Sequence, residues 1–79
     1  MNISELRSLL KKSYIRGNAY SLDGGLPHDR HVLNNLGDGR WEVYYSERGG
    51  KFETEQFRSE SEACQCILQR LLGDSTARD

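Results

Sequence analysis

The most strand-like stretch of this chain reads Arg40-Trp41-Glu42-Val43-Tyr44-Tyr45-Ser46-Glu47. It concentrates the aromatic and β-branched residues that favour extended backbone. Because successive side chains of a strand point to opposite faces, Trp41, Val43 and Tyr45 share one face, whereas Tyr44 shares the other with Glu42. We expect the Trp41 face to be buried and the Tyr44 face to look at solvent.

Two further strands are expected beside this one. The turn Gly37-Asp38-Gly39 separates it from a strand at residues 31–36, and Arg48-Gly49-Gly50 separates it from a strand at residues 51–57. The last strand is mostly polar and charged, which is typical of an edge strand that resists edge-to-edge aggregation. Together the three strands predict an antiparallel meander.

Amphipathic helices are expected on both sides of this meander. Asn2 with Glu5, and Ser59 with Glu62, have the spacing of a capping box, in which two side chains satisfy free backbone amides at a helix start. The first helix is expected over residues 3–15. The second helix carries a wide apolar stripe made of Ala63, Cys64, Ile67, Leu68, Leu71 and Leu72.

These elements predict a fold class. A three-stranded sheet needs one face covered, and neither helix can bury its apolar face alone. The pattern therefore predicts an α+β fold with two layers, ordered helix, three-stranded antiparallel meander, helix, with both helices on one sheet face. With 79 residues, the chain has room for one small domain. We expect a single domain over residues 1–73, followed by a flexible C-terminal tail at residues 74–79.

Composition restricts the classes of function. The chain has 11 basic and 12 acidic side chains and a net charge of −1, so no overall field draws it to nucleic acid or to an anionic membrane. No apolar run approaches the ~20 residues of a membrane span, and the N-terminus lacks the basic and apolar regions of a signal peptide. We therefore expect a cytoplasmic protein that does not bind a membrane.

The segment from Tyr20 to Arg30 is rich in turn-forming residues, with Gly24, Gly25 and Pro27 close together. An irregular segment of this length in a small domain is usually functional or mobile. The pattern leaves open whether this loop is functional or only structural.

Metal binding and disulfide formation are not expected. Cys64 and Cys66 lie two residues apart in the second helix, where their side chains point to different sides, so they neither bridge each other nor share a zinc ion. His28 and His31 would need a helix to converge on a metal, and Pro27 argues against one. Free thiols of this kind fit a reducing compartment. We expect no metal site and no cofactor.

Catalytic groups are not expected either. A nucleophile needs a base within hydrogen-bond reach, and Cys64 lies on an apolar helix face that disfavours its thiolate. Gly24 and Gly25 lack the strand–loop–helix context of a phosphate-binding loop. We therefore expect a non-enzymatic protein with no catalytic residues. The alternative of nucleic-acid binding rests on the basic N-terminal region and on Tyr44 as a stacking ring, against many carboxylates that repel phosphate.

Residues 44–50 combine aromatic rings, an acid, an arginine and permissive glycines. Tyr and Arg are enriched among the residues that dominate protein–protein binding. The candidate partner-binding residues are Glu42, Tyr44, Glu47, Arg48 and Asp23. Ordinary strand and hairpin-turn roles also explain these residues, so both interpretations stay open.

Three runs of the chain carry a family resemblance. They are Ala19-Tyr20-Ser21-Leu22-Asp23-Gly24-Gly25-Leu26-Pro27, Trp41-Glu42-Val43-Tyr44-Tyr45-Ser46-Glu47-Arg48-Gly49 and Phe57-x-Ser59-Glu60-x-Glu62-Ala63-Cys64. Over about residues 3–72, the chain resembles a family of short bacterial proteins that are similar to the immunity proteins of polymorphic and contact-dependent toxin systems. The resemblance implies a cytoplasmic, non-enzymatic protein that binds and blocks a toxin domain, and it carries over no binding residue.

An acidic surface is the feature expected to serve that function. Its residues are Asp23, Asp29, Glu42, Glu47, Glu53 and Glu55. Such a surface complements a basic nuclease-type toxin and speeds its capture. A generic regulatory adaptor protein would show the same features, and the pattern sets neither the partner nor the oligomeric state.

Overall fold

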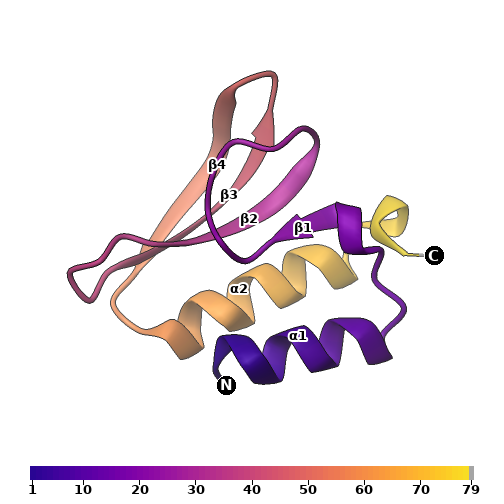
Figure 1. The fold of residues 1–79 in the computed structure, drawn as a ribbon, viewed down its shortest axis with the longest axis horizontal. Coiled ribbons are helices and arrows are strands. Elements are labelled where there is room, and N and C mark those ends of the chain that lie inside the picture. Colours follow the sequence, from indigo (N-terminus) through magenta and orange to yellow (C-terminus); the bar gives the residue numbers. More distant parts are fainter. Residues whose placement is uncertain (79) are drawn as a thin grey trace.

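The computed structural model describes residues 1–78 as an α+β fold of two helices, four strands and two short 3-10 turns (Figure 1). The elements, in chain order, are α1 (Ile3–Lys12), η1 (Gly17–Ala19), β1 (Tyr20–Ser21), β2 (Arg30–Asn35), β3 (Trp41–Glu47), β4 (Gly50–Phe57), α2 (Glu60–Leu72) and η2 (Ser75–Ala77). The α+β class is as predicted, and each predicted helix and strand is present.

The sheet has one strand more than the sequence predicts. Its order is β1-β2-β3-β4, with β3 antiparallel to both of its neighbours. The added strand, β1, runs parallel to β2 with Tyr20 beside His31. The expected three-stranded antiparallel sheet is therefore a four-stranded mixed sheet. Two residues are too few to show the alternation that marks a strand, so β1 leaves no signal in the sequence.

The first helix begins as expected and ends early. Asn2 and Glu5 form the capping box, each side chain bonding to the other residue's amide. The helix stops at Lys12 rather than near residue 15, because Tyr14 adopts a left-handed conformation with a φ of 59°. The amide of Ile15 then donates to the carbonyl of Leu10, the bond that closes a Schellman motif.

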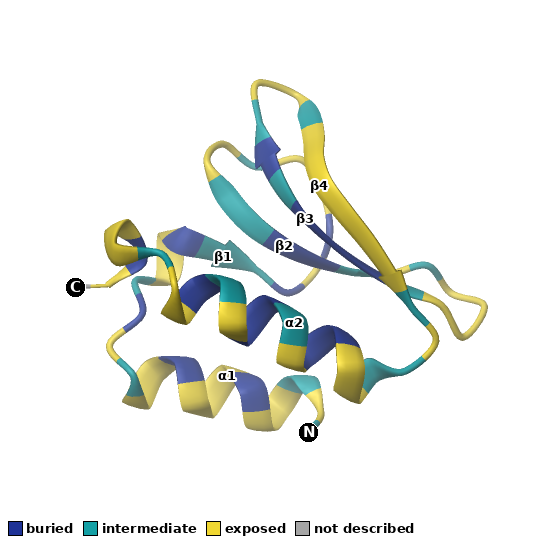
Figure 2. Ribbon diagram, turned by 180° about the vertical axis from the view of Figure 1, so that it is seen from behind, coloured by how far each residue is buried: buried dark blue, intermediate teal, exposed yellow. Residues whose placement is uncertain are grey.

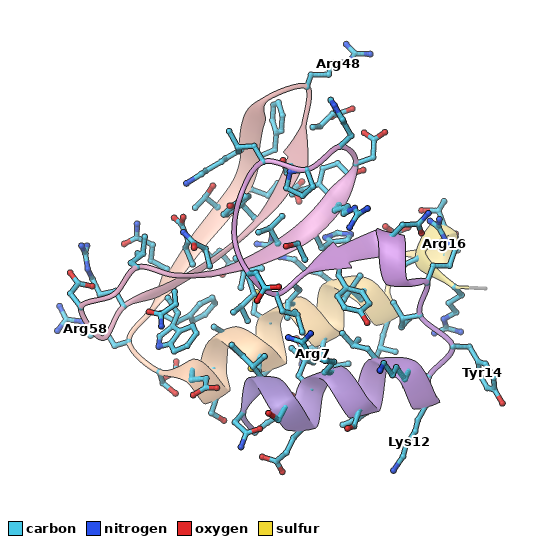
Figure 3. The ribbon with its side chains drawn as sticks, viewed as in Figure 1. Arg7, Lys12, Tyr14, Arg16, Arg48 and Arg58 are labelled. Atoms are coloured by element: carbon cyan, nitrogen blue, oxygen red, sulfur yellow. The ribbon has the colours of Figure 1, made fainter. Side chains whose placement is uncertain are left out.

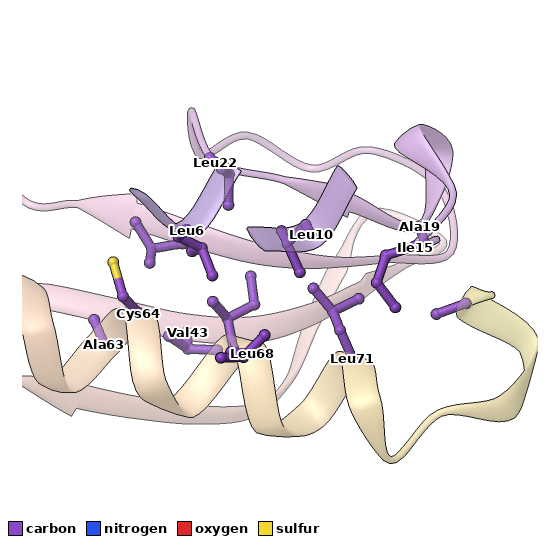
Figure 4. Close-up of a cluster of buried hydrophobic side chains, with 13 residues drawn as sticks. Leu6, Leu10, Ile15, Ala19, Leu22, Val43, Ala63, Cys64, Leu68 and Leu71 are labelled. Atoms are coloured by element: carbon purple, nitrogen blue, oxygen red, sulfur yellow. The ribbon is translucent and has the colours of Figure 1, made fainter. Parts of the chain in front are cut away.

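Both helices lie on one side of the sheet, side by side, with α2 the nearer to the strands (Figures 1 and 2). The apolar core fills the space between them and the sheet, and the Trp41 face of β3 contributes Val43 to it (Figure 4). Trp41 itself is half-buried and packs against this core. The core consists of Leu6, Leu10, Ile15, Ala19, Leu22, Leu33, Val43, Ala63, Cys64, Ile67, Leu68, Leu71 and Ala77.

The opposite face of the sheet is covered as well. Parallel neighbours such as β1 and β2 need a crossover connection, and here residues 22–29, the crossover loop, provide it. The loop passes over the face that carries Tyr44, Glu42 and Ser46, and these residues are 1%, 4% and 0% exposed. The expectation that the Tyr44 face looks at solvent is therefore wrong.

The chain continues past α2 into packed structure. Asp74 caps η2, and Ala77 is buried in the core. The backbone amide of Arg16 donates to the carbonyl of Ala77 over 2.7 Å, and Ile15 forms a β-bridge with Arg78. The core thus extends beyond residue 73, where the sequence places the domain boundary. Asp79, the last residue of the expected tail, lies outside the described residues.

Candidate functional site

The Tyr44 face holds the crossover loop in place. The hydroxyl of Tyr44 donates to the carbonyl of Gly25, and the hydroxyl of Ser46 donates to the carbonyl of Pro27, both over 2.6 Å. Glycine is favoured at residue 24, which has a φ of +73° and where a Cβ would lie 2.4 Å from Oδ1 of Asn34, so that this side chain would have to shift. The Tyr44 side chain, which sequence reasoning assigned to a partner, is thus used inside the molecule.

Glu42 is the centre of a buried polar cluster on this face. Its Oε1 accepts hydrogen bonds from Nδ2 of Asn34 (3.0 Å) and Nζ of Lys51 (2.9 Å). The same ammonium lies 4.7 Å from the centre of the Tyr44 ring. Although burial alone opposes ionisation, the bonds from Asn34 and Lys51 and the lysine charge hold the pKa of Glu42 below its usual value.

The two charged groups of the cluster, Glu42 and Lys51, are paired with each other. The hydrogen bond to Glu42 raises the pKa of Lys51, so both partners stay charged at neutral pH. Burial raises the pKa of the Tyr44 phenol; the Lys51 charge opposes this rise and the Glu42 charge adds to it. The carboxylate already accepts from two donors, and Tyr44 donates to Gly25, so this cluster fastens the loop rather than waiting for a substrate.

The remaining candidate residues are accessible but lie on two different segments. Arg48 is exposed at the tip of the β3–β4 hairpin, where it projects away from the helices (Figure 3), and Glu47 beside it is half-buried. Asp23 is exposed on the crossover loop. The structure therefore does not gather the five predicted binding residues on one accessible surface.

The outer edge of β4 is an accessible feature of the sheet. The sequence predicts an edge strand at residues 51–57, and in residues 1–78 no strand pairs with the outer side of β4. Its residues 51–56 are all exposed (Figure 2). A β-bulge between Val43 and Tyr45 divides the edge, and Glu53 in the bulge has a φ of 55°. The edge is open along residues 54–57, of which residues 55–57 keep a regular register with β3.

A groove of about 400 Å³ runs between this edge and α2. It is lined by Glu55, Phe57, Ser61, Glu62, Gln65, Cys66 and Gln69. The half-buried Phe57 and Cys66 provide apolar surface, while the exposed Glu55 and Glu62 provide carboxylates. Sequence reasoning missed this groove. The residues that could have indicated it are Phe57 and Cys66, because both are apolar and lie outside the main apolar pattern of the core.

Arg70 joins α2 to the edge strand at the groove. Its Nη2 donates to Oε1 of Glu55 over 2.8 Å and to the carbonyl of Glu53 over 2.6 Å. Sγ of Cys66 lies 3.9 Å from the same Glu55 oxygen. Burial raises the pKa of the Cys66 thiol, and also that of Cys64, so neither is a thiolate at neutral pH. The Cys66 thiol of the groove is thus not an activated nucleophile. What the groove presents to a partner is apolar surface and negative charge.

A second titratable pair lies away from the groove. Nε2 of His31 is 3.0 Å from Oδ2 of Asp74, and hydrogen bonds from Thr76 and then His31 lower the pKa of Asp74. The His31 ring packs edge-on against Tyr45, 5.0 Å between centroids. This pair ties β2 to the segment after α2. Within residues 1–78, no group of three or more His, Cys, Asp or Glu side chains is placed to hold a metal ion.

Comparisons with known proteins find no relative of this chain. No family model, no curated protein and no solved structure matches the chain. Within residues 1–78, neither helix has the length and the apolar run that crossing a membrane requires.

Proposed function

We propose that this chain is a small, non-enzymatic protein-binding module of the immunity type, which occupies and blocks a basic toxin domain inside the cell. The observation that carries the proposal is the open edge of β4, exposed along residues 51–56 and bordered by a groove against α2. Exposed sheet edges are recurring docking sites for partner chains. Glu55 is paired with Arg70 and the Cys66 thiol beside it is protonated, which favours recognition over chemistry.

Charge supports a basic partner. Glu53, Glu55 and Glu62 are exposed on the edge and groove, and Arg70 compensates one of these three carboxylates. The uncompensated carboxylates of this surface attract a basic domain and speed its association. Glu47, Arg48 and Asp23 are further accessible contacts in this proposal, whereas Glu42 and Tyr44 act as positioning residues that fix the crossover loop.

The test is co-expression with the toxin domain of a secreted protein encoded beside this gene. We expect the chain to relieve the growth arrest and to bind the purified domain in calorimetry. The variant Glu55→Gln/Glu62→Gln removes two negative charges from the groove and should bind more weakly. Its control, Ser4→Lys/Ser8→Lys, makes the same change in net charge on exposed residues of α1 and should bind nearly as the wild type does.

Two results would overturn the proposal. Arrest that persists in the presence of the folded chain would show that the chain does not block that toxin. Tight binding to labelled oligonucleotides, weakening steeply with salt, would instead support the nucleic-acid alternative, because phosphate contacts release counterions.

A further inference from the structure

We propose that the groove between β4 and α2 binds an extended, basic segment of the partner, which adds to the sheet as a fifth strand beside residues 54–57. This inference rests on the proposed function and names the partner chemistry of the same surface. It follows from three features of the edge: its free backbone groups, its groove and its charge.

The backbone of the edge has capacity for another strand. In an edge strand, alternate residues turn their N–H and C=O groups away from the sheet, where they template pairing with a further chain. Beyond the bulge formed by Glu53 and Thr54, residues 55–57 keep a regular register with β3, from Trp41–Phe57 to Val43–Glu55. The segment is short, and it suits a partner strand that pairs with about four residues.

The groove gives the added strand a place for its side chains. Alternate side chains of that strand would point toward α2, where Phe57 and Cys66 offer half-buried apolar surface. Strand addition of this kind takes affinity from backbone hydrogen bonds and specificity from pockets for alternate side chains. At the bulge end, Arg70 bridges Glu55 and the Glu53 carbonyl and so limits the length of the site.

Charge disfavours a second copy of this chain and favours a basic segment. A second β4 edge would bring its own Glu53 and Glu55 to the same carboxylates, and like charges facing each other destabilise a sheet. Glu62 adds a third carboxylate from α2. Lys or Arg side chains on the incoming strand would meet these carboxylates. Arg58 and Arg40 line a second, smaller hollow together with Gln56 and Phe57, whereas the lining of the groove itself carries Glu55 and Glu62 and no Lys or Arg.

The experiment uses the full chain and synthetic peptides that alternate arginine with valine, leucine or phenylalanine over eight positions. Nuclear magnetic resonance should show saturable shifts confined to residues 54–57 and to the α2 residues of the groove. Hydrogen exchange of the outward amides in residues 54–57 should slow. The same peptides with alternate backbone nitrogens methylated keep their charges but lose donors, and should bind about tenfold more weakly or worse.

Two variants separate the groove from general electrostatics. Glu55→Gln/Glu62→Gln should weaken peptide binding several-fold, whereas Ser4→Lys/Ser8→Lys, with the same net charge, should change it by less than about twofold. The inference is overturned if no peptide of the set binds, if methylated and unmethylated peptides bind alike, or if sedimentation shows a dimer through β4. A chain that still blocks its toxin in any of these cases leaves the proposed function standing, which keeps the two failures distinct.

Discussion

The hydroxyl of Tyr44 donates a 2.6 Å hydrogen bond to the carbonyl oxygen of Gly25, nineteen residues earlier in the chain. Backbone carbonyls of an irregular loop need partners where the loop packs against the sheet, because leaving them unpaired there costs free energy. Tyr44 and Ser46 supply two such partners from one face of β3. The crossover loop is therefore anchored by strand side chains, and removing one anchor should lower the stability of the whole fold.

Replacing Tyr44 with Phe removes this hydrogen bond and keeps the ring beneath the Lys51 ammonium. We expect Tyr44→Phe to lower the free energy of unfolding by about 1–2 kcal/mol, because the Gly25 carbonyl loses its buried donor. Urea denaturation measures this as a lower midpoint with an unchanged slope. Tyr14→Phe is the control, since Tyr14 is 74% exposed, and should stay within about 0.5 kcal/mol of the wild type. Equal midpoints for the two variants would contradict an anchoring role for Tyr44.

Gly24 and Gly49 allow backbone strain to be separated from steric overlap. Their φ angles are similar, +73° and +77°, but a Cβ at Gly24 meets Asn34 at 2.4 Å, whereas one at Gly49 meets nothing within 4 Å. Gly49→Ala should therefore cost only the left-handed strain of about 1–2 kcal/mol. Gly24→Ala should cost about 1–3 kcal/mol more, because Asn34 must shift away from Glu42.

Thermal or urea unfolding of the two alanine variants gives the comparison. In Gly24→Ala/Asn34→Ala the clash is gone, so the extra cost of Gly24→Ala should be partly recovered relative to Asn34→Ala alone. Equal losses for Gly24→Ala and Gly49→Ala would show that Asn34 moves freely and does not restrict residue 24.

Local signals in the sequence were sufficient for most of the elements. The capping box of Asn2 and Glu5 and the glycine turns around β3 act between neighbouring residues, so their structures were predictable. Which face of β3 is exposed to solvent was not predictable. Trp41-Glu42-Val43-Tyr44-Tyr45 places large residues on both faces, and alternation alone does not say whether one face or both are covered.

The error on the candidate site has the same origin. Because Glu42 and Ser46 are polar, the sequence pattern predicts that the Tyr44 face is exposed to solvent and available to a partner. In the structure Lys51 and Asn34 satisfy Glu42, and the Pro27 carbonyl satisfies Ser46. These partners come from β4, β2 and the crossover loop. The loop crosses this face because β1 pairs in parallel with β2, a contact between residues far apart in the sequence that local patterns do not reveal. The exposed negative charge on β4, by contrast, is predictable, because Glu53 and Glu55 lie in an alternating strand pattern.

The pH dependence of stability should reveal the Glu42 cluster. Because the folded protein lowers the pKa of Glu42 below its usual value of 4.5, the ionised form stabilises the fold. That contribution is fully present above the unfolded pKa and is lost as pH falls through the lower folded pKa. Glu42→Gln should thus be less stable than the wild type at pH 7, and the difference should shrink below about pH 4.5. Urea titrations at a series of pH values check this, and a difference that stays constant down to pH 3 would contradict it.

The segment after α2 gives the last prediction, since Ala77 is 1% exposed and Ser75, two residues earlier, is exposed. Ala77→Asp places a carboxylate in the core without a partner and should lower the free energy of unfolding by about 2–4 kcal/mol. Ser75→Asp introduces the same charge into solvent and should stay within about 0.5 kcal/mol of the wild type. Denaturant midpoints of the two variants separate a packed segment from a flexible tail, because a tail without contacts would leave both variants as stable as the wild type.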